Sequence, residues 1–165
     1  MLKSFHCVNG LPPDLLHDLL EGVVAEDLLS VIRALAKKGW LTIDLYNNKL
    51  KNVGWKSYES NDRPELVPKS KNVSKLKGKA ISIWVHIRNF PIIIEQFIED
   101  RNDAVLRLAL KLHELLERAT ATEFLEYEIH LLDDTIIDYL DLRKEVRAVL
   151  PDEFQRPKPK HHFMR

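Results

Sequence analysis

The sequence has very little cysteine and glycine: a single cysteine, Cys7, and five glycines among 165 residues. One cysteine excludes an internal disulfide and a zinc site built from several thiolates. The scarcity of glycine leaves long stretches of chain in which a helix is not interrupted. These absences favour a helical protein of a reducing compartment, the nucleus or the cytoplasm.

Long apolar runs are also missing. The most apolar short runs, such as Pro91 to Ile94, are far below the roughly 18–20 residues that a membrane-spanning helix needs. Residues 1–10 contain no apolar stretch long enough for a signal peptide. We therefore expect a protein that is neither secreted nor inserted in a membrane.

Net charge is absent as well, because 25 basic residues balance 25 acidic ones. The charges are nevertheless separated along the chain: residues 69–79 hold five lysines and no acid, and residues 95–153 hold sixteen acids and seven Lys or Arg. The lysine-rich stretch, above all Lys75, Lys77 and Lys79, is a candidate for contacting DNA phosphates. The alternative is a solvated linker. The acidic helices, over 123–141, are a candidate face for a protein partner.

Apolar residues recur every three to four positions, which predicts helices. The first helix begins at Pro12-Pro13-Asp14 and ends at Gly39, with a possible break at Gly22, and a short one follows Thr42 or Asp44. Residues 52–73 are predicted as a loop. Further helices are predicted from Ser74, with a kink or restart at Pro91, from Asn102 or Asp103, and from residues 122–126 to about Leu150.

No strand pattern, repeat or phosphate-binding glycine motif is present. The sequence therefore predicts a mainly α fold, a bundle of about four to five helices with extended N- and C-terminal segments.

Asp14, His17, Asp18 and Glu21 share one face of the first predicted helix. A carboxylate at a helix start, followed one turn later by an imidazole, can hold a divalent metal or orient its water. The alternative is ordinary capping of the helix dipole by acids. A metal site formed by His86, His113 and His130 inside the bundle is a marginal further interpretation.

Three stretches resemble one family. Residues 10–22, with the string Pro-Pro-Asp-Leu-Leu-His-Asp over 12–18, resemble the segment around the second catalytic aspartate of eukaryotic DDE-type transposases related to the CACTA and Kyakuja–Dileera–Zisupton groups. Residues 77–91 look like the helical insertion of those enzymes, and residues 157–165 resemble the stretch that returns to their catalytic core.

This resemblance implies a ribonuclease-H-like core in the parent enzyme, with three acids that hold two Mg²⁺ ions about 3.5–4 Å apart for cutting and joining DNA. Asp14 matches the second acid and is the metal ligand only in an intact parent, and His17 matches a supporting residue. The first acid is expected before residue 1 and the third beyond residue 165. We therefore expect that the chain alone does not cut DNA and binds no cofactor.

The implied organisation has three parts. Residues 1–13 correspond to a remnant of the core, 14–150 to a helical domain containing the loop 52–73, and 151–165 to an extended tail. The function expected from the resemblance is that of a transposase-derived helical insertion region, and the alternative is a stand-alone helical module that binds protein or DNA.

Overall fold

A computed structural model describes residues 15–55, 61–121, 123, 125–151 and 154 of the chain. In this part the fold is mainly helical and has no strand, which confirms the predicted fold class. The helices are η1 (Leu15–Val24, a π-helix), α1 (Ala25–Lys37), α2 (Ile43–Lys51), α3 (Ala80–Ile94), η3 (Glu95–Phe97), α4 (Ala104–Ala119), α5 (Glu126–Glu145) and η4 (Val146–Ala148).

Several helix ends lie where the sequence predicts them. The Thr42 hydroxyl accepts a hydrogen bond from the Leu45 amide at 3.2 Å and caps α2. The Asp103 carboxylate accepts from two amides of the first turn of α4 and caps that helix. Gly39, with φ +87°, follows the end of α1 in the left-handed conformation that glycine adopts most easily.

Two predicted boundaries are wrong, at Gly22 and Ser74, and the start of the last helix lies at the end of its predicted range. Gly22 does not break the first helix, because η1 continues directly into α1. The helix expected from Ser74 begins instead at Ala80, since residues before it run beside α1. The last helix begins at Glu126, where the carboxylate of Glu128 accepts from the Leu125 amide at 2.7 Å. Pro91 lies inside α3, which continues to Ile94 before the 3₁₀ turn η3.

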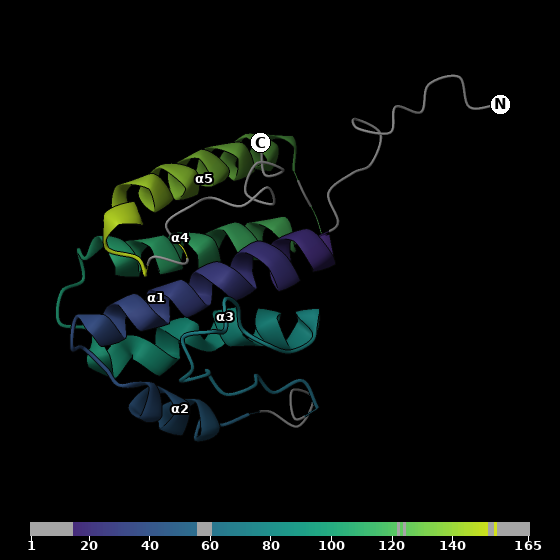
Figure 1. Cartoon of the computed structure of the whole chain (residues 1–165). Helices are drawn as coiled ribbons and strands as arrows, with labels where there is room; N and C mark the ends of the chain where they lie inside the picture. Colours follow the sequence, from purple (N-terminus) through teal and green to yellow (C-terminus); the bar gives the residue numbers. More distant parts are fainter. Residues whose placement is uncertain (1–14, 56–60, 122, 124, 152–153, 155–165) are drawn as a thin grey trace.

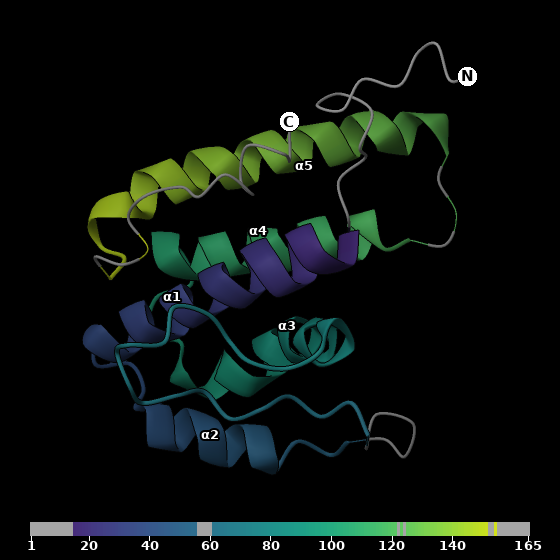
Figure 2. The same cartoon turned by 45° about the vertical axis from the view of Figure 1, so that its right-hand side comes forward.

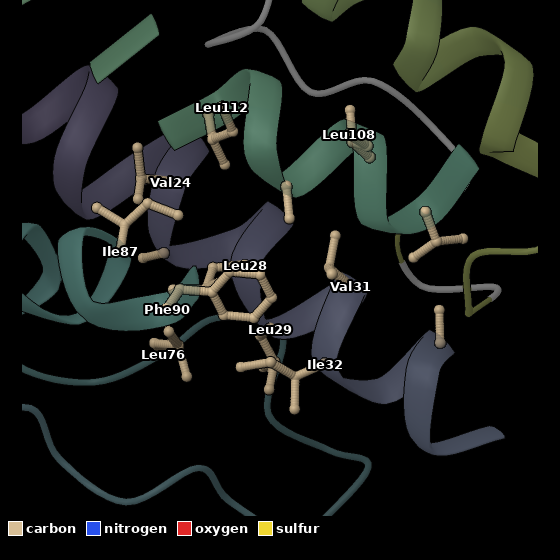
Figure 3. Packing of buried hydrophobic residues seen from close by; sticks show 14 of the residues in the cluster. Val24, Leu28, Leu29, Val31, Ile32, Leu76, Ile87, Phe90, Leu108 and Leu112 are labelled. Carbon is tan, nitrogen blue, oxygen red and sulfur yellow. The ribbon is translucent and has the colours of Figure 1, made fainter. Parts of the chain in front are cut away.

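Helix α1 lies in the middle of the bundle. In Figures 1 and 2 it runs between α4 and α5 on one side and α2 and α3 on the other. Ten of its thirteen residues are buried. Around it gather side chains from η1, α3, α4 and the segment before α3, and Figure 3 labels Val24, Leu28, Leu29, Val31, Ile32, Leu76, Ile87, Phe90, Leu108 and Leu112. Full burial of each such aliphatic side chain contributes about 1.5–3 kcal/mol.

Because α1 is surrounded, its polar side chains must find partners inside the protein. Asp27 is fully buried and accepts hydrogen bonds from Arg143 of α5, with Nε–Oδ2 2.7 Å and Nη2–Oδ1 3.1 Å. The hydroxyl of Tyr139 donates to the same carboxylate, and Arg143 also donates to the carbonyl of Phe154 at 3.3 Å. Burial and the neighbouring Asp27 charge raise the pKa of Tyr139, so its phenol stays protonated. This cluster joins α1 to α5.

Breaking this ion pair takes away the carboxylate to which a buried guanidinium is hydrogen-bonded. Asp27→Asn is therefore expected to destabilise the protein by about 3–5 kcal/mol, measured by urea unfolding followed by circular dichroism. The control is Lys144→Gln, which removes an exposed ion pair with Asp141 and should cost less than about 1 kcal/mol. Equal effects of the two substitutions would contradict the role given to Asp27.

A second buried polar pair joins α2 to α3. The hydroxyl of Tyr46 and Nε2 of His86 share a hydrogen bond of 2.9 Å, and both residues are almost fully buried. Burial lowers the pKa of His86 from 6.5 to about 3 and raises the pKa of Tyr46. His86 is therefore neutral at physiological pH.

This depressed pKa makes stability depend on pH. Between pH 6.5 and about 3 the unfolded chain binds a proton at His86 that the folded chain does not. The stability is therefore complete above pH 6.5 and falls as the pH drops, by about 2 kcal/mol at pH 5. His86→Gln, which keeps a polar group near Tyr46, should flatten this dependence in urea unfolding between pH 7 and 5. An unchanged pH profile would contradict the prediction.

Candidate functional site

Of the two residues matched to the transposase motif, only one lies in the described part. Asp14 is outside the described residues, and the side chain of His17 is exposed on η1. Asp18 and Glu21 are half-buried. Among residues 15–55, 61–121 and 125–151, no three His, Cys, Asp or Glu side chains are arranged to hold a metal ion.

The three histidines of the marginal metal-site interpretation have different surroundings. His86 is bonded to Tyr46 inside the core, His113 is half-buried on α4, and His130 is exposed on α5. They form no metal-binding group in the described part of the chain.

The lysine-rich stretch lies in a segment that we call the strap, residues 67–80, which leads into α3. The strap runs antiparallel to α1 and η1, on the side of α1 away from α5 (Figures 1 and 2). It has no regular secondary structure before Ala80. Its position is set by hydrogen bonds to side chains and carbonyls of three helices.

The first anchor of the strap is Asn47 of α2. Its side-chain amide donates to the Val67 carbonyl at 3.0 Å and its carbonyl accepts from the Val67 amide at 2.9 Å. Both residues are buried, so this pair satisfies main-chain groups of the strap that would otherwise be costly to bury.

Arg33 of α1 provides the second anchor. Its guanidinium donates to the carbonyl of Ser70 at 2.6 Å and to that of Val73 at 2.8 Å. The same guanidinium lies 5.8 Å from the ring centre of Phe154. One side chain thus fixes two peptide groups of the strap against the central helix.

The last anchors are at the junction of η1 and α1. The Leu76 amide donates to the Ala25 carbonyl at 2.9 Å, and the Leu76 side chain is buried. The ammonium group of Lys75 donates to the Glu21 carbonyl at 3.1 Å, and the Glu21 carboxylate accepts from the Ala80 amide at 3.2 Å. Glu21 therefore caps α3, where a carboxylate also complements the helix dipole.

Gly78 allows the turn from the strap into α3. Its φ of +124° suits glycine alone, and a Cβ there would lie 2.7 Å from Oγ of Ser82. The glycine therefore lets the chain bend closely over the first turn of the helix.

These anchors divide the lysines of the strap into two groups. Lys69 pairs with Asp44, with Nζ–Oδ1 2.6 Å, and Lys75 is bonded to the main chain of η1. Lys71, Lys77 and Lys79 are exposed, and the structure gives their ammonium groups no partner among the described residues. Of the three lysines predicted to contact DNA, Lys75 thus has its ammonium group engaged by the protein, whereas those of Lys77 and Lys79 have no described partner.

Sequence reasoning missed the anchoring residues. Arg33 interrupts the apolar pattern of α1 and Asn47 interrupts that of α2, which is a weak signal of a buried polar contact. Neither position indicates a partner 20 to 40 residues away in sequence.

Comparison of the chain with protein-family models, with curated proteins and with solved structures gave no match. Among the described residues, no helix is both long enough and apolar enough to cross a membrane.

Removing an anchor should release the strap without disrupting the core. Asn47→Ala leaves the Val67 peptide groups unpaired, and we expect trypsin to cut after the strap lysines about tenfold faster. Asn48→Ala, at the exposed neighbouring position, is the matched control and should leave the rate unchanged. Equal cleavage rates in both variants would show that the Asn47–Val67 pair does not hold the strap.

Proposed function

We propose that this chain is the helical insertion region of a transposase-like protein related to the CACTA and Kyakuja–Dileera–Zisupton groups, and that it binds DNA without cutting it. The observation that carries the proposal is the strap. Its lysines are exposed, and its main chain is hydrogen-bonded to residues of three helices. The helical fold is also the one that the resemblance implies.

The anchored backbone favours binding to phosphates. Lys77 and Lys79 alternate with buried Leu76 and with Gly78 along the segment. Lys77 and Lys79 are both exposed. The hydrogen bonds of the anchors already hold the main chain around them, so binding a phosphate backbone requires no further ordering of that main chain. Contacts of this kind are independent of base sequence.

In an intact enzyme of this type, Asp14 would join two further acids around Mg²⁺, with His17 in support. The helical region would shape the DNA channel beside that centre. This role implies action in the nucleus.

A second candidate function is a stand-alone interaction module. Two features support it: a core that closes around α1, and apolar side chains that remain exposed along acidic α5.

DNA binding through the strap should depend on salt. We expect Lys77→Ala/Lys79→Ala to weaken binding to duplex DNA and to lower the slope of log K against log salt concentration by about 2, since each phosphate contact contributes about 0.9. Fluorescence anisotropy at several salt concentrations measures both. Lys51→Ala/Lys144→Ala removes the same charge from α2 and α5 and should bind like the wild type. Identical slopes for the two double variants would contradict the proposed binding of DNA by the strap lysines.

The chain should show no strand cleavage. Incubation of the chain with end-labelled duplex and Mg²⁺ or Mn²⁺ is expected to leave the DNA intact, because a two-metal centre needs more than one carboxylate. Cleavage that disappears in Asp14→Ala would contradict this part of the proposal.

A further inference from the structure

The first half of α5 has exposed or half-buried side chains only, up to residue 134. None of its first nine residues, 126–134, is buried, and the first buried side chain is that of Thr135. Yet apolar residues are frequent here: Leu125, Tyr127 and Ile129 are each 58–60% exposed. Single exposed apolar residues are ordinary, but a group of them within two helical turns is a feature of binding surfaces.

The second half of α5 shows which side of the helix belongs to the bundle. Tyr139, Leu142 and Arg143 are buried there, facing α1 and α4. Next to this inner face runs a second line of apolar residues at spacings of four, three, four and four. We call it the α5 stripe: Leu125, Ile129, Leu132, Ile136 and Leu140.

The spacing of the α5 stripe is that of a helix-packing seam. Residues three and four apart lie on one face of a helix, and such a line receives the side chains of a second helix between its own. The stripe runs from Leu125 to Leu140, fifteen residue steps, or about 22 Å at 1.5 Å per residue. Its first two residues are largely exposed and the last three are half-buried, with Ile136 and Leu140 packed against the core. The most accessible part of the stripe is therefore its beginning, at Leu125 and Ile129.

The negative charge around the α5 stripe indicates which kind of partner can bind to it. Residues 119–142 contain seven acids and neither Lys nor Arg. Glu126 and Asp133 lie beside the α5 stripe, and both are exposed. A nucleic acid would be repelled by this surface, and so would a second copy of α5 packed against the first. A helix with Lys or Arg on either side of its own apolar stripe matches both the apolar line and its flanking charges.

We infer that the α5 stripe binds a basic amphipathic helix of a partner protein. The inference deepens the interaction-module function proposed above and makes no use of the strap. DNA and the partner helix would then occupy opposite sides of α1.

The test uses the whole chain and a synthetic helical peptide of leucine and lysine, with Leu at the same four-three spacing and Lys at the flanking positions. Fluorescence anisotropy of the labelled peptide measures binding. We expect Leu125→Ser/Ile129→Ser to weaken binding at least tenfold, and Glu126→Lys/Asp133→Lys to do the same. Both pairs are exposed, so the circular dichroism spectrum should not change.

Two controls separate the seam from general attraction between opposite charges. Ile92→Ser alters an equally exposed apolar residue on α3 and should bind the peptide like the wild type. A peptide with Glu in place of Lys should not bind. Binding that is unaffected by Leu125→Ser/Ile129→Ser would overturn the inference, as would wild-type dimers in sedimentation that dissociate in this variant.

Failure of this inference can be distinguished from failure of the proposed DNA binding. Lys77→Ala/Lys79→Ala should leave peptide binding unchanged. If the peptide fails to bind while salt-dependent DNA binding persists, the inference about α5 fails and the role of the strap stands.

Discussion

The fold depends on the polar groups of a helix that is buried on nearly every side. Helix α1 supplies the apolar centre of the bundle, and Asp27 lies fully buried within it. The carboxylate is compensated by Arg143 and Tyr139, which brings α5 onto the bundle. On the other side, Arg33 and the Ala25 carbonyl bind main-chain groups of the strap. The hydrogen bonds made by polar groups of α1 therefore position both the acidic helix α5 and the lysine-rich strap.

Much of the helical framework could be predicted from the sequence, since it is encoded locally. Leucine spacing predicts α1, and Thr42 and Asp103 have the side chains that cap α2 and α4. The strap could not be predicted, because its order comes from partners far away in sequence, such as Asn47 and Arg33. By itself, a segment rich in lysine resembles a linker. The Asp27–Arg143 pair, 116 residues apart, leaves no local signal either.

For the candidate site, the sequence predicts the lysines but does not separate those that hold the strap from those that face solvent. Lys75 and Lys77 look equivalent in sequence. Both are exposed in the folded chain, but the ammonium group of Lys75 donates to the Glu21 carbonyl, whereas that of Lys77 has no partner among the described residues. The motif of Asp14 and His17 stays a prediction, because Asp14 lies outside the described residues. Its chemistry also requires acids that the resemblance assigns to other parts of a parent enzyme.

The central claim is that the strap is part of the fold and presents its lysines from a fixed backbone. Hydrogen–deuterium exchange of single amides tests it most directly, since the amides of Val67, Leu76 and Ala80 are bonded within the protein. We predict that these amides exchange at least about a hundredfold more slowly than in an unfolded chain. Exchange of all three at the rate of an unfolded peptide, while α1 remains protected, would show that the strap is a solvated linker and would contradict the account.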